Sequence, residues 1–176
     1  MRRLTGLLLV LMIALPACWP ISQHATVEVH EGAKISLVVR PMFSFHSDWY
    51  RKLVIETQEG SFEQALFEDT GWWRGSNLYL HKSGIYILHE GQAGCMELTV
   101  LSPQLDSYPE ISCEKSIAEL DGSAFGGNDA LQRFPPSKFY KDFMFIGHFM
   151  EKPKEREAIS FIPADRLQEP ELPDIL

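Results

Sequence analysis

Apolar and polar residues alternate along much of the chain beyond position 24, and this period of two limits the possible folds more than any other feature. Successive side chains of a β-strand point to opposite faces of a sheet, so alternation is typical of strands with one buried face. The clearest segments are residues 25–30, 34–40, 77–90 and 95–101. Further strands are predicted at residues 52–57, 62–68, 143–149 and 158–162. Residues 143–149 are apolar on both faces, which predicts a central place in a sheet.

The first hairpin is expected to join residues 25–30 to residues 34–40. A three-residue loop from Glu31 to Ala33 would place Val29 opposite Ile35 and keep the apolar residues of both strands on one face. Because a shift of one residue would turn that face toward water, we predict this register for the hairpin.

A second hairpin is expected between residues 77 and 90, around Lys82, Ser83 and Gly84. Gly84 suits the left-handed third position of a three-residue loop. The resulting register places on one face Leu78, Leu80, Tyr86 and Leu88. It places on the other face Tyr79, His81, Ile85, Ile87 and His89. With a further turn into residues 95–101, residues 77–101 are predicted to form a three-stranded antiparallel meander.

Helix signals are few. Ser116 and Glu119 have the spacing of a capping box, but Gly122 and Gly126 prevent a long helix after them. Residues 121–137 are predicted to form a long surface loop. The sequence therefore predicts a mostly β fold with an antiparallel sheet, either barrel-like or a sandwich, and minor helix.

The N-terminus has the features of an export signal. Arg2 and Arg3 precede an unbroken apolar run at residues 7–15, which is too short to span a membrane as a helix. The run ends in Leu15-Pro16-Ala17-Cys18, which resembles the lipobox of bacterial lipoproteins. The resemblance implies cleavage after Ala17 and attachment of fatty acyl chains such as palmitate to Cys18. The alternative is an ordinary secretory signal that is cleaved near Ala17 and leaves Cys18 as a free thiol.

Trp19 follows the lipobox cysteine, where an Asp would retain an enterobacterial lipoprotein in the inner membrane. The resemblance therefore implies a lipid-anchored protein of the cell envelope, at the outer membrane and facing the periplasm. The expected organisation is a signal peptide at 1–17, a lipidated tether at 18–24, a single β-rich domain at 25–162 and an acidic, proline-containing tail at 163–176. The tail has few apolar residues, so we expect it to be mostly extended.

Two cysteines remain besides Cys18, namely Cys95 and Cys113. An exported protein meets an oxidising compartment, where a disulfide between them is the expected state. A metal site with two cysteine ligands is the alternative, although no His or Cys lies at finger-like spacing from either one.

The charge of the chain limits its partners. It carries 16 Lys and Arg against 24 Asp and Glu, for a net charge of −8. Removal of residues 1–17 would take away two arginines and no acidic residue, so the mature chain would carry −10. Such a balance argues against binding to nucleic acid, which needs clustered Lys and Arg.

The sequence contains no familiar catalytic or phosphate-binding motif, and we predict neither a cofactor nor a metal. His148 lies in the most apolar strand and is interpreted as a core histidine. The most unusual segment contains Trp72, Trp73 and Arg74 between glycines. With Tyr79 and His81, it would form a stacking platform for a glycan or peptide. The alternative is that one Trp packs in the core and the other is partly covered.

Three function classes fit these features. The first is a non-catalytic binding or assembly module, attached to the bilayer by Cys18, with an envelope protein or glycan as its partner. The second is an inhibitor or immunity lipoprotein that neutralises an envelope-directed enzyme or toxin, for which the acidic charge would suit a basic partner. The third is an envelope hydrolase. The sequence favours the first, a protein that is not an enzyme.

Overall fold

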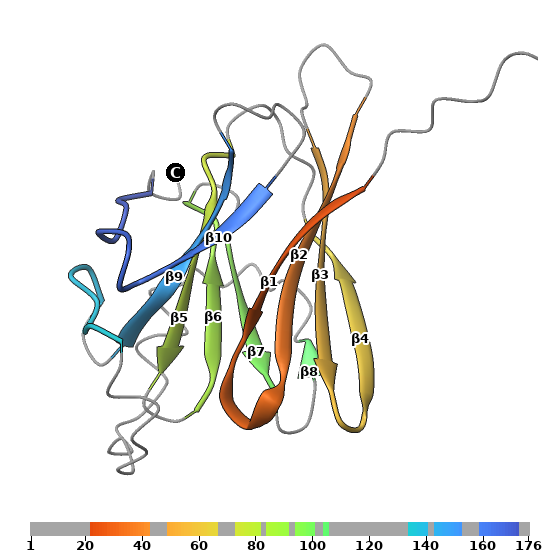
Figure 1. Cartoon of the computed structure of the whole chain (residues 1–176), viewed down its shortest axis with the longest axis horizontal. Helices are drawn as coiled ribbons and strands as arrows, with labels where there is room; N and C mark the ends of the chain where they lie inside the picture. Colours follow the sequence, from red (N-terminus) through yellow and green to blue (C-terminus); the bar gives the residue numbers. More distant parts are fainter. Residues whose placement is uncertain are drawn as a thin grey trace, which may run out of the picture.

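The computed structural model describes residues 22–42, 49–66, 73–81, 84–91, 94–100, 104–105, 134–140, 143–152 and 159–172. In these residues the chain forms ten strands and one 3-10 turn, arranged as two antiparallel sheets that face each other (Figure 1). The mostly β, antiparallel prediction is confirmed. Of the two architectures considered, the sandwich is consistent with the two separate sheets, which do not close into a barrel.

The first sheet is built from the N-terminal part of the chain. Its four strands pair in sequence order as β1-β2-β3-β4. Their bounds are Gln23–Glu28 for β1, Lys34–Pro41 for β2, Trp49–Thr57 for β3 and Gly60–Ala65 for β4, with the 3-10 turn η1 at His30–Gly32. Each strand follows its predecessor along the chain, so this sheet forms entirely from local pairings.

The second sheet combines segments that are distant in sequence. Its six strands have the order β10-β9-β5-β6-β7-β8. Their bounds are Ser76–His81 for β5, Tyr86–His89 for β6, Cys95–Thr99 for β7, Gln104–Leu105 for β8, Phe143–Glu151 for β9 and Ile159–Pro163 for β10. The meander of β5, β6 and β7 is as predicted, and β9 lies between β10 and β5, which confirms its central place.

The main apolar core lies between the sheets. Alternate residues of β1, β2, β3, β5, β6, β7 and β9 enter it. Many of these side chains have no exposed surface, among them Ile35, Leu37, Val39, Leu53, Ile55, Leu78, Leu88 and Leu98. Burial of such side chains is the main favourable term in folding, at about 1.5–3 kcal/mol for each. The period of two in the sequence therefore translates directly into the two inner faces.

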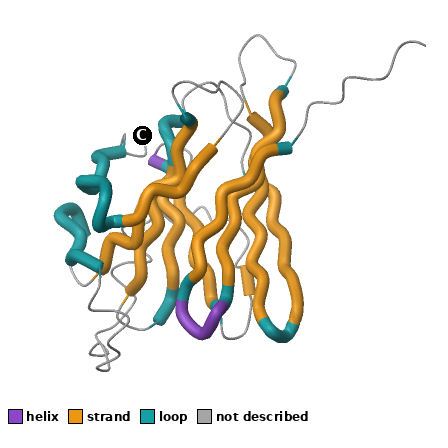
Figure 2. The backbone as a smooth tube through the Cα atoms, in the orientation of Figure 1, coloured by secondary structure: helices purple, strands orange, loops and turns teal. Residues whose placement is uncertain are grey.

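The second sheet is buried on its outer face as well. A smaller apolar cluster lies there, made of Tyr79, Ile87, Cys95, Phe143, Phe145 and Ala164. Residues 134–140 and the segment after β10 lie beside this sheet, away from the first sheet (Figure 2). Every described residue of β5 and β6 is accordingly buried. This double burial explains why β9 is apolar on both faces.

The register of the β5–β6 hairpin agrees with the prediction. Leu78 pairs with Leu88 and Leu80 pairs with Tyr86. The loop closes through a hydrogen bond from the amide of His81 to the carbonyl of Ile85, at 2.8 Å. Gly84 has φ +90°, the left-handed conformation that the loop was expected to need.

The register predicted for the β1–β2 hairpin is wrong by two residues. Val27, not Val29, pairs with Ile35. The amide of Val29 instead bonds the carbonyl of Ala33, at 2.8 Å, so the three-residue loop is His30 to Gly32. Gly32 has φ +73° and fills its third position, the same role that Gly84 has. Because the shift is even, the apolar residues still face the core.

The boundaries of the domain extend beyond the predicted ones. Gln23 and His24, which were assigned to the tether, already belong to β1. Pro163, the first residue of the predicted tail, ends β10. The chain then packs against the second sheet as far as Leu172, which is buried, instead of extending away from it. The signal peptide and Cys18 lie outside the described residues, as do the predicted capping box and most of the 121–137 loop.

Candidate functional site

In the segment predicted to form a binding platform, the side chain of Trp73 points into the core between the sheets. The Trp73 side chain is only 8% exposed, and its indole Nε1 donates a hydrogen bond to Ser76 Oγ at 3.0 Å. Arg74 is exposed, and its guanidinium donates to the carbonyl of Trp73 at 3.2 Å. Trp72 lies outside the described residues. Trp73 therefore fits the alternative in which one tryptophan packs in the core.

Tyr79 and His81 lie on the opposite side of the second sheet from Trp73. Both are buried, Tyr79 within the outer apolar cluster and His81 with its ring 4.8 Å from that of Phe143. The structure thus does not bring Trp73, Tyr79 and His81 to one exposed surface. The reason is the pleat of β5, which directs odd-numbered side chains away from the core that Trp73 enters.

A polar cluster that the sequence analysis did not identify joins the two sheets. Arg51 of β3 forms an ion pair with Glu90, directly after β6, and both side chains are completely buried. Ser76 Oγ donates to the same carboxylate at 3.0 Å, and the Arg51 guanidinium lies 5.4 Å from the centre of the Trp73 ring. We call Arg51, Trp73, Ser76 and Glu90 the inter-sheet cluster. Extending the alternation of residues 52–57 back to Arg51 would have placed this charge on the inner face.

A second polar network fastens the C-terminal segment to the outer face of the second sheet. The buried carboxylate of Glu169 accepts hydrogen bonds from Ser137 Oγ at 2.7 Å and from the Lys138 amide at 2.6 Å. Asn77 Nδ2 donates to the carbonyl of Pro170 at 2.8 Å and to the Tyr79 hydroxyl at 2.9 Å. Asn77 of β5 and residues 137–138 thus hold the C-terminal segment in place at Glu169 and Pro170. The acidic composition of this segment did not predict these contacts.

Two titratable groups beside Asn77, Tyr79 and His148, are held in their neutral forms. Burial, reinforced by the negative charge of Glu169, raises the pKa of Tyr79, so the phenol keeps its proton. Burial lowers the pKa of His148 to about 4, and its Nδ1 donates to Asn77 Oδ1 at 2.7 Å. The interpretation of His148 as a satisfied core histidine agrees with this position. Both groups act as constant hydrogen-bonding partners near neutral pH.

The other predicted features have mixed outcomes. Cys95 is disulfide-bonded, while Cys113, its expected partner, lies outside the described residues. His89 packs edge-on against the ring of Tyr140, with centroids 5.6 Å apart.

Within the described ranges, no three His, Cys, Asp or Glu side chains gather closely enough to hold a metal ion. The same ranges contain no helix that is long and apolar enough to cross a bilayer.

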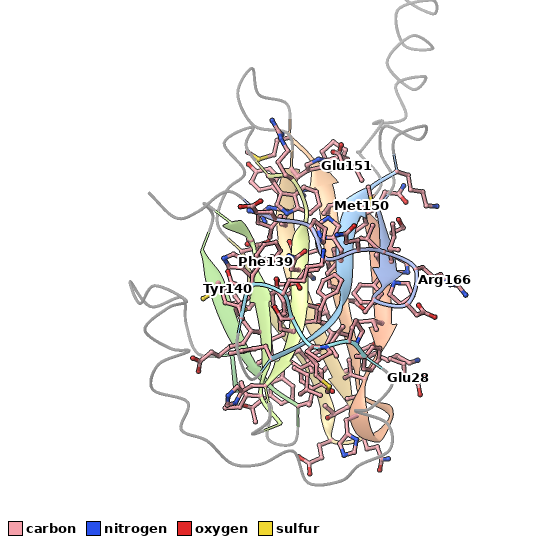
Figure 3. The ribbon with its side chains drawn as sticks, turned by 90° about the vertical axis from the view of Figure 1, so that its left-hand side faces the viewer. Glu28, Phe139, Tyr140, Met150, Glu151 and Arg166 are labelled. Carbon is pink, nitrogen blue, oxygen red and sulfur yellow. The ribbon has the colours of Figure 1, made fainter. Side chains whose placement is uncertain are left out.

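Three large aromatic side chains are exposed in the part of the chain that the structure describes. They are Tyr50, Phe62 and Phe139, at 43%, 36% and 46% exposure. Tyr50 lies under the Arg40 guanidinium, which is 4.8 Å from its ring centre. Phe139 projects from a turn at residues 137–140 and is labelled in Figure 3. Exposed aromatics of this kind are the strongest candidates for contacts with other molecules.

Comparison of the chain with known protein families, with curated proteins and with solved structures finds no significant match. The candidate surfaces are therefore assigned from the chemistry of this chain alone.

The inter-sheet cluster generates a first prediction. Substitution Arg51→Met would leave the Glu90 carboxylate buried without its counter-charge, and we expect a loss of about 3–5 kcal/mol in the free energy of unfolding. The control is Lys52→Met, because Lys52 pairs with Glu63 at 2.7 Å in an exposed bridge worth at most about 1 kcal/mol. Urea unfolding of both variants measures the difference. Equal losses would contradict the structural role of the buried pair.

A second prediction concerns pH. Because folding lowers the pKa of His148 to about 4, the unfolded chain binds a proton between roughly pH 6.5 and 4 that the folded chain does not. Stability should therefore fall as the pH falls through this window, by up to about 3 kcal/mol from this residue. His148→Asn removes the titration, so its stability should depend less steeply on pH. Urea unfolding across the window tests this, and identical slopes for both proteins would refute it.

Proposed function

We propose that this protein is a membrane-anchored lipoprotein of the cell envelope that binds a partner and catalyses no reaction. The observation that carries the proposal is the lipobox-like sequence Leu15-Pro16-Ala17-Cys18, which ends five residues before β1 begins at Gln23. An acylated Cys18 would hold the sandwich close to the bilayer. Several acyl chains on one cysteine give stable attachment, whereas a single chain binds only marginally.

The fold supports a binding role. Its buried charged groups connect structural elements: Arg51 and Glu90 join the sheets, and Glu169 fixes the C-terminal segment to the turn at residues 137–140. A framework braced in this way presents its exposed side chains with little freedom. Binding then costs less conformational entropy than it would on a flexible surface.

The turn around Phe139 is the element that we assign to partner contact. Ser137 Oγ accepts hydrogen bonds from the amides of Phe139 and Tyr140, at 3.1 and 3.0 Å. The same hydroxyl donates to the Glu169 carboxylate, which fixes the turn to the C-terminal segment. Aromatic residues, Phe included, are enriched at the cores of protein interfaces, and a rigid turn limits the freedom that is lost on binding. The partner that we propose is another envelope protein or a glycan.

The position of this turn relative to the proposed anchor fits the role. The amide of Ser137 bonds the carbonyl of Phe143, so the turn lies beside the start of β9. The other end of β9 carries Glu151, which accepts a hydrogen bond from the indole of Trp49. Trp49 lies at the end of the first sheet at which β1 begins. Phe139 therefore lies away from the end of the domain at which the lipid would be attached.

The anchor can be tested by metabolic labelling with palmitate and by fractionation of cells. The wild-type protein should incorporate label and sediment with membranes, and Cys18→Ser should do neither. Cys95→Ser is the matched control, because it removes a disulfide-bonded cysteine but leaves the proposed acyl acceptor, and it should keep the label. A wild-type protein without label would disprove the lipoprotein proposal.

The binding role can be tested with a photo-crosslinking benzophenone amino acid in place of Phe139 in living cells. We expect a discrete crosslinked adduct from this position. The same probe at Phe62, which is also exposed but lies on β4, should give none. Protease or glycosidase treatment then separates a protein partner from a glycan. Crosslinking that is absent from position 139, or equal at both positions, would argue against the assigned surface.

A further inference from the structure

One exposed pair lies at the end of the first sheet where the chain arrives from Cys18. Val39 pairs with Gln23 of β1 on one side and with Arg51 of β3 on the other. The next position of the ladder, beyond the start of β1, pairs Arg40 with Tyr50. The beginning of β1 and this end of β2 and β3 lie together at the upper end of the sheet in Figure 1.

The short connection limits how far this end can be from a bilayer. Gln23 is the fifth residue after Cys18, and a fully extended chain of five residues spans at most about 18 Å. The polar headgroup region adds several ångströms beyond the hydrocarbon in which the acyl chains lie. A tether of this length allows an anchored protein to bring Arg40 and Tyr50 within reach of lipid headgroups.

The chemistry of the pair suits such a surface. Both side chains point away from the core, since their neighbours Val39 and Arg51 are buried. The Arg40 guanidinium lies 4.8 Å from the ring centre of Tyr50, and the ring is 43% exposed. A tyrosine ring favours the boundary between hydrocarbon and water. A cation near anionic lipids gains about 1 kcal/mol.

The charges on the same outer face change along the sheet. At the far end, Lys34 pairs with Glu28 and with Glu56, which leaves one net negative charge. Nearer the anchor end, Lys52 is neutralised by Glu63. Arg40 thus gives this outer face a positive charge at the anchor end, and the acidic far end of the same face would be repelled by an anionic membrane.

We propose that Arg40 and Tyr50 form a second membrane contact, with the Tyr50 ring among lipid headgroups and the Arg40 guanidinium on lipid phosphates. This inference rests on the proposed lipid anchor at Cys18. The anchor alone holds the protein at the membrane but leaves its orientation free. The second contact fixes the orientation, so that the Phe139 turn is presented to the aqueous compartment.

The experiment compares two positions on β4 that share the outer face of the sheet. Ala65 pairs with Lys52 near the anchor end, and Ser61 pairs with Glu56 at the far end, four residues or about 13 Å away. Both residues are small and exposed. Spin labels on Ala65→Cys and Ser61→Cys leave Arg40 and Tyr50 intact. The labelled, acylated protein is reconstituted in vesicles of phosphatidylethanolamine and phosphatidylglycerol.

We expect the label at position 65 to collide with a water-soluble nickel chelate several-fold less often than the label at position 61. The additional substitutions Arg40→Gln and Tyr50→Ala should abolish this difference. Equal collision rates in the wild-type background, or a difference that survives both substitutions, would overturn the second contact. Mass measurement of the acyl chains on the same preparation distinguishes that result from failure of the anchor itself.

Discussion

Arg51 and Glu90 come from opposite sheets, and their side chains have no contact with solvent. A single buried charge costs several kcal/mol, so each of these residues requires the other to be in place. Apolar side chains would tolerate small sliding movements between the sheets, whereas an ion pair bonded also to Ser76 does not. We infer that this pair fixes how the two inner faces dock. Trp73, which packs on the guanidinium and bonds Ser76, is part of the same constraint.

The second sheet depends on a further constraint, because it is apolar on both faces but has the first sheet on only one. The chain solves this with its own C-terminal segment. Glu169 and Pro170 are held by Ser137, Lys138 and Asn77, and the segment thereby covers the cluster around Tyr79 and Phe145. The sandwich therefore has a third, irregular layer beside the second sheet, which Figure 2 shows as loops at the left of the strands.

The sequence predicted the elements that local physics determines. Apolar patterning located every described strand except the two-residue β8, and Gly84 gave the correct register for β5 and β6. The β1–β2 register was wrong because the apolar faces agree with either of two registers that differ by two residues. Applying the glycine rule to Gly32, as to Gly84, would have selected the right one.

The candidate site was less predictable, because it depends on contacts between distant residues. A pair of tryptophans beside an arginine has the same sequence whether it lies on the surface or against a buried charge. Only the position of Arg51 on β3 shows that Trp73 has an internal partner. Likewise, nothing local in residues 163–172 indicates that Asn77 and Ser137 will hold them. An exposed aromatic such as Phe139 could be identified only after the turn was seen to be fixed by Glu169.

The strand order also determines when each sheet can form. A chain that emerges N-terminus first, from the ribosome or from an export channel, can pair β1 to β4 as soon as residue 65 is free. In contrast, β5 has to wait for β9, whose residues Phe143 to Phe149 pair with it across some seventy intervening positions. Closing such a distant contact is slow, because the loop entropy is lost before the contact forms. Completion of the second sheet is therefore the late step, and it requires nearly the whole chain to have emerged.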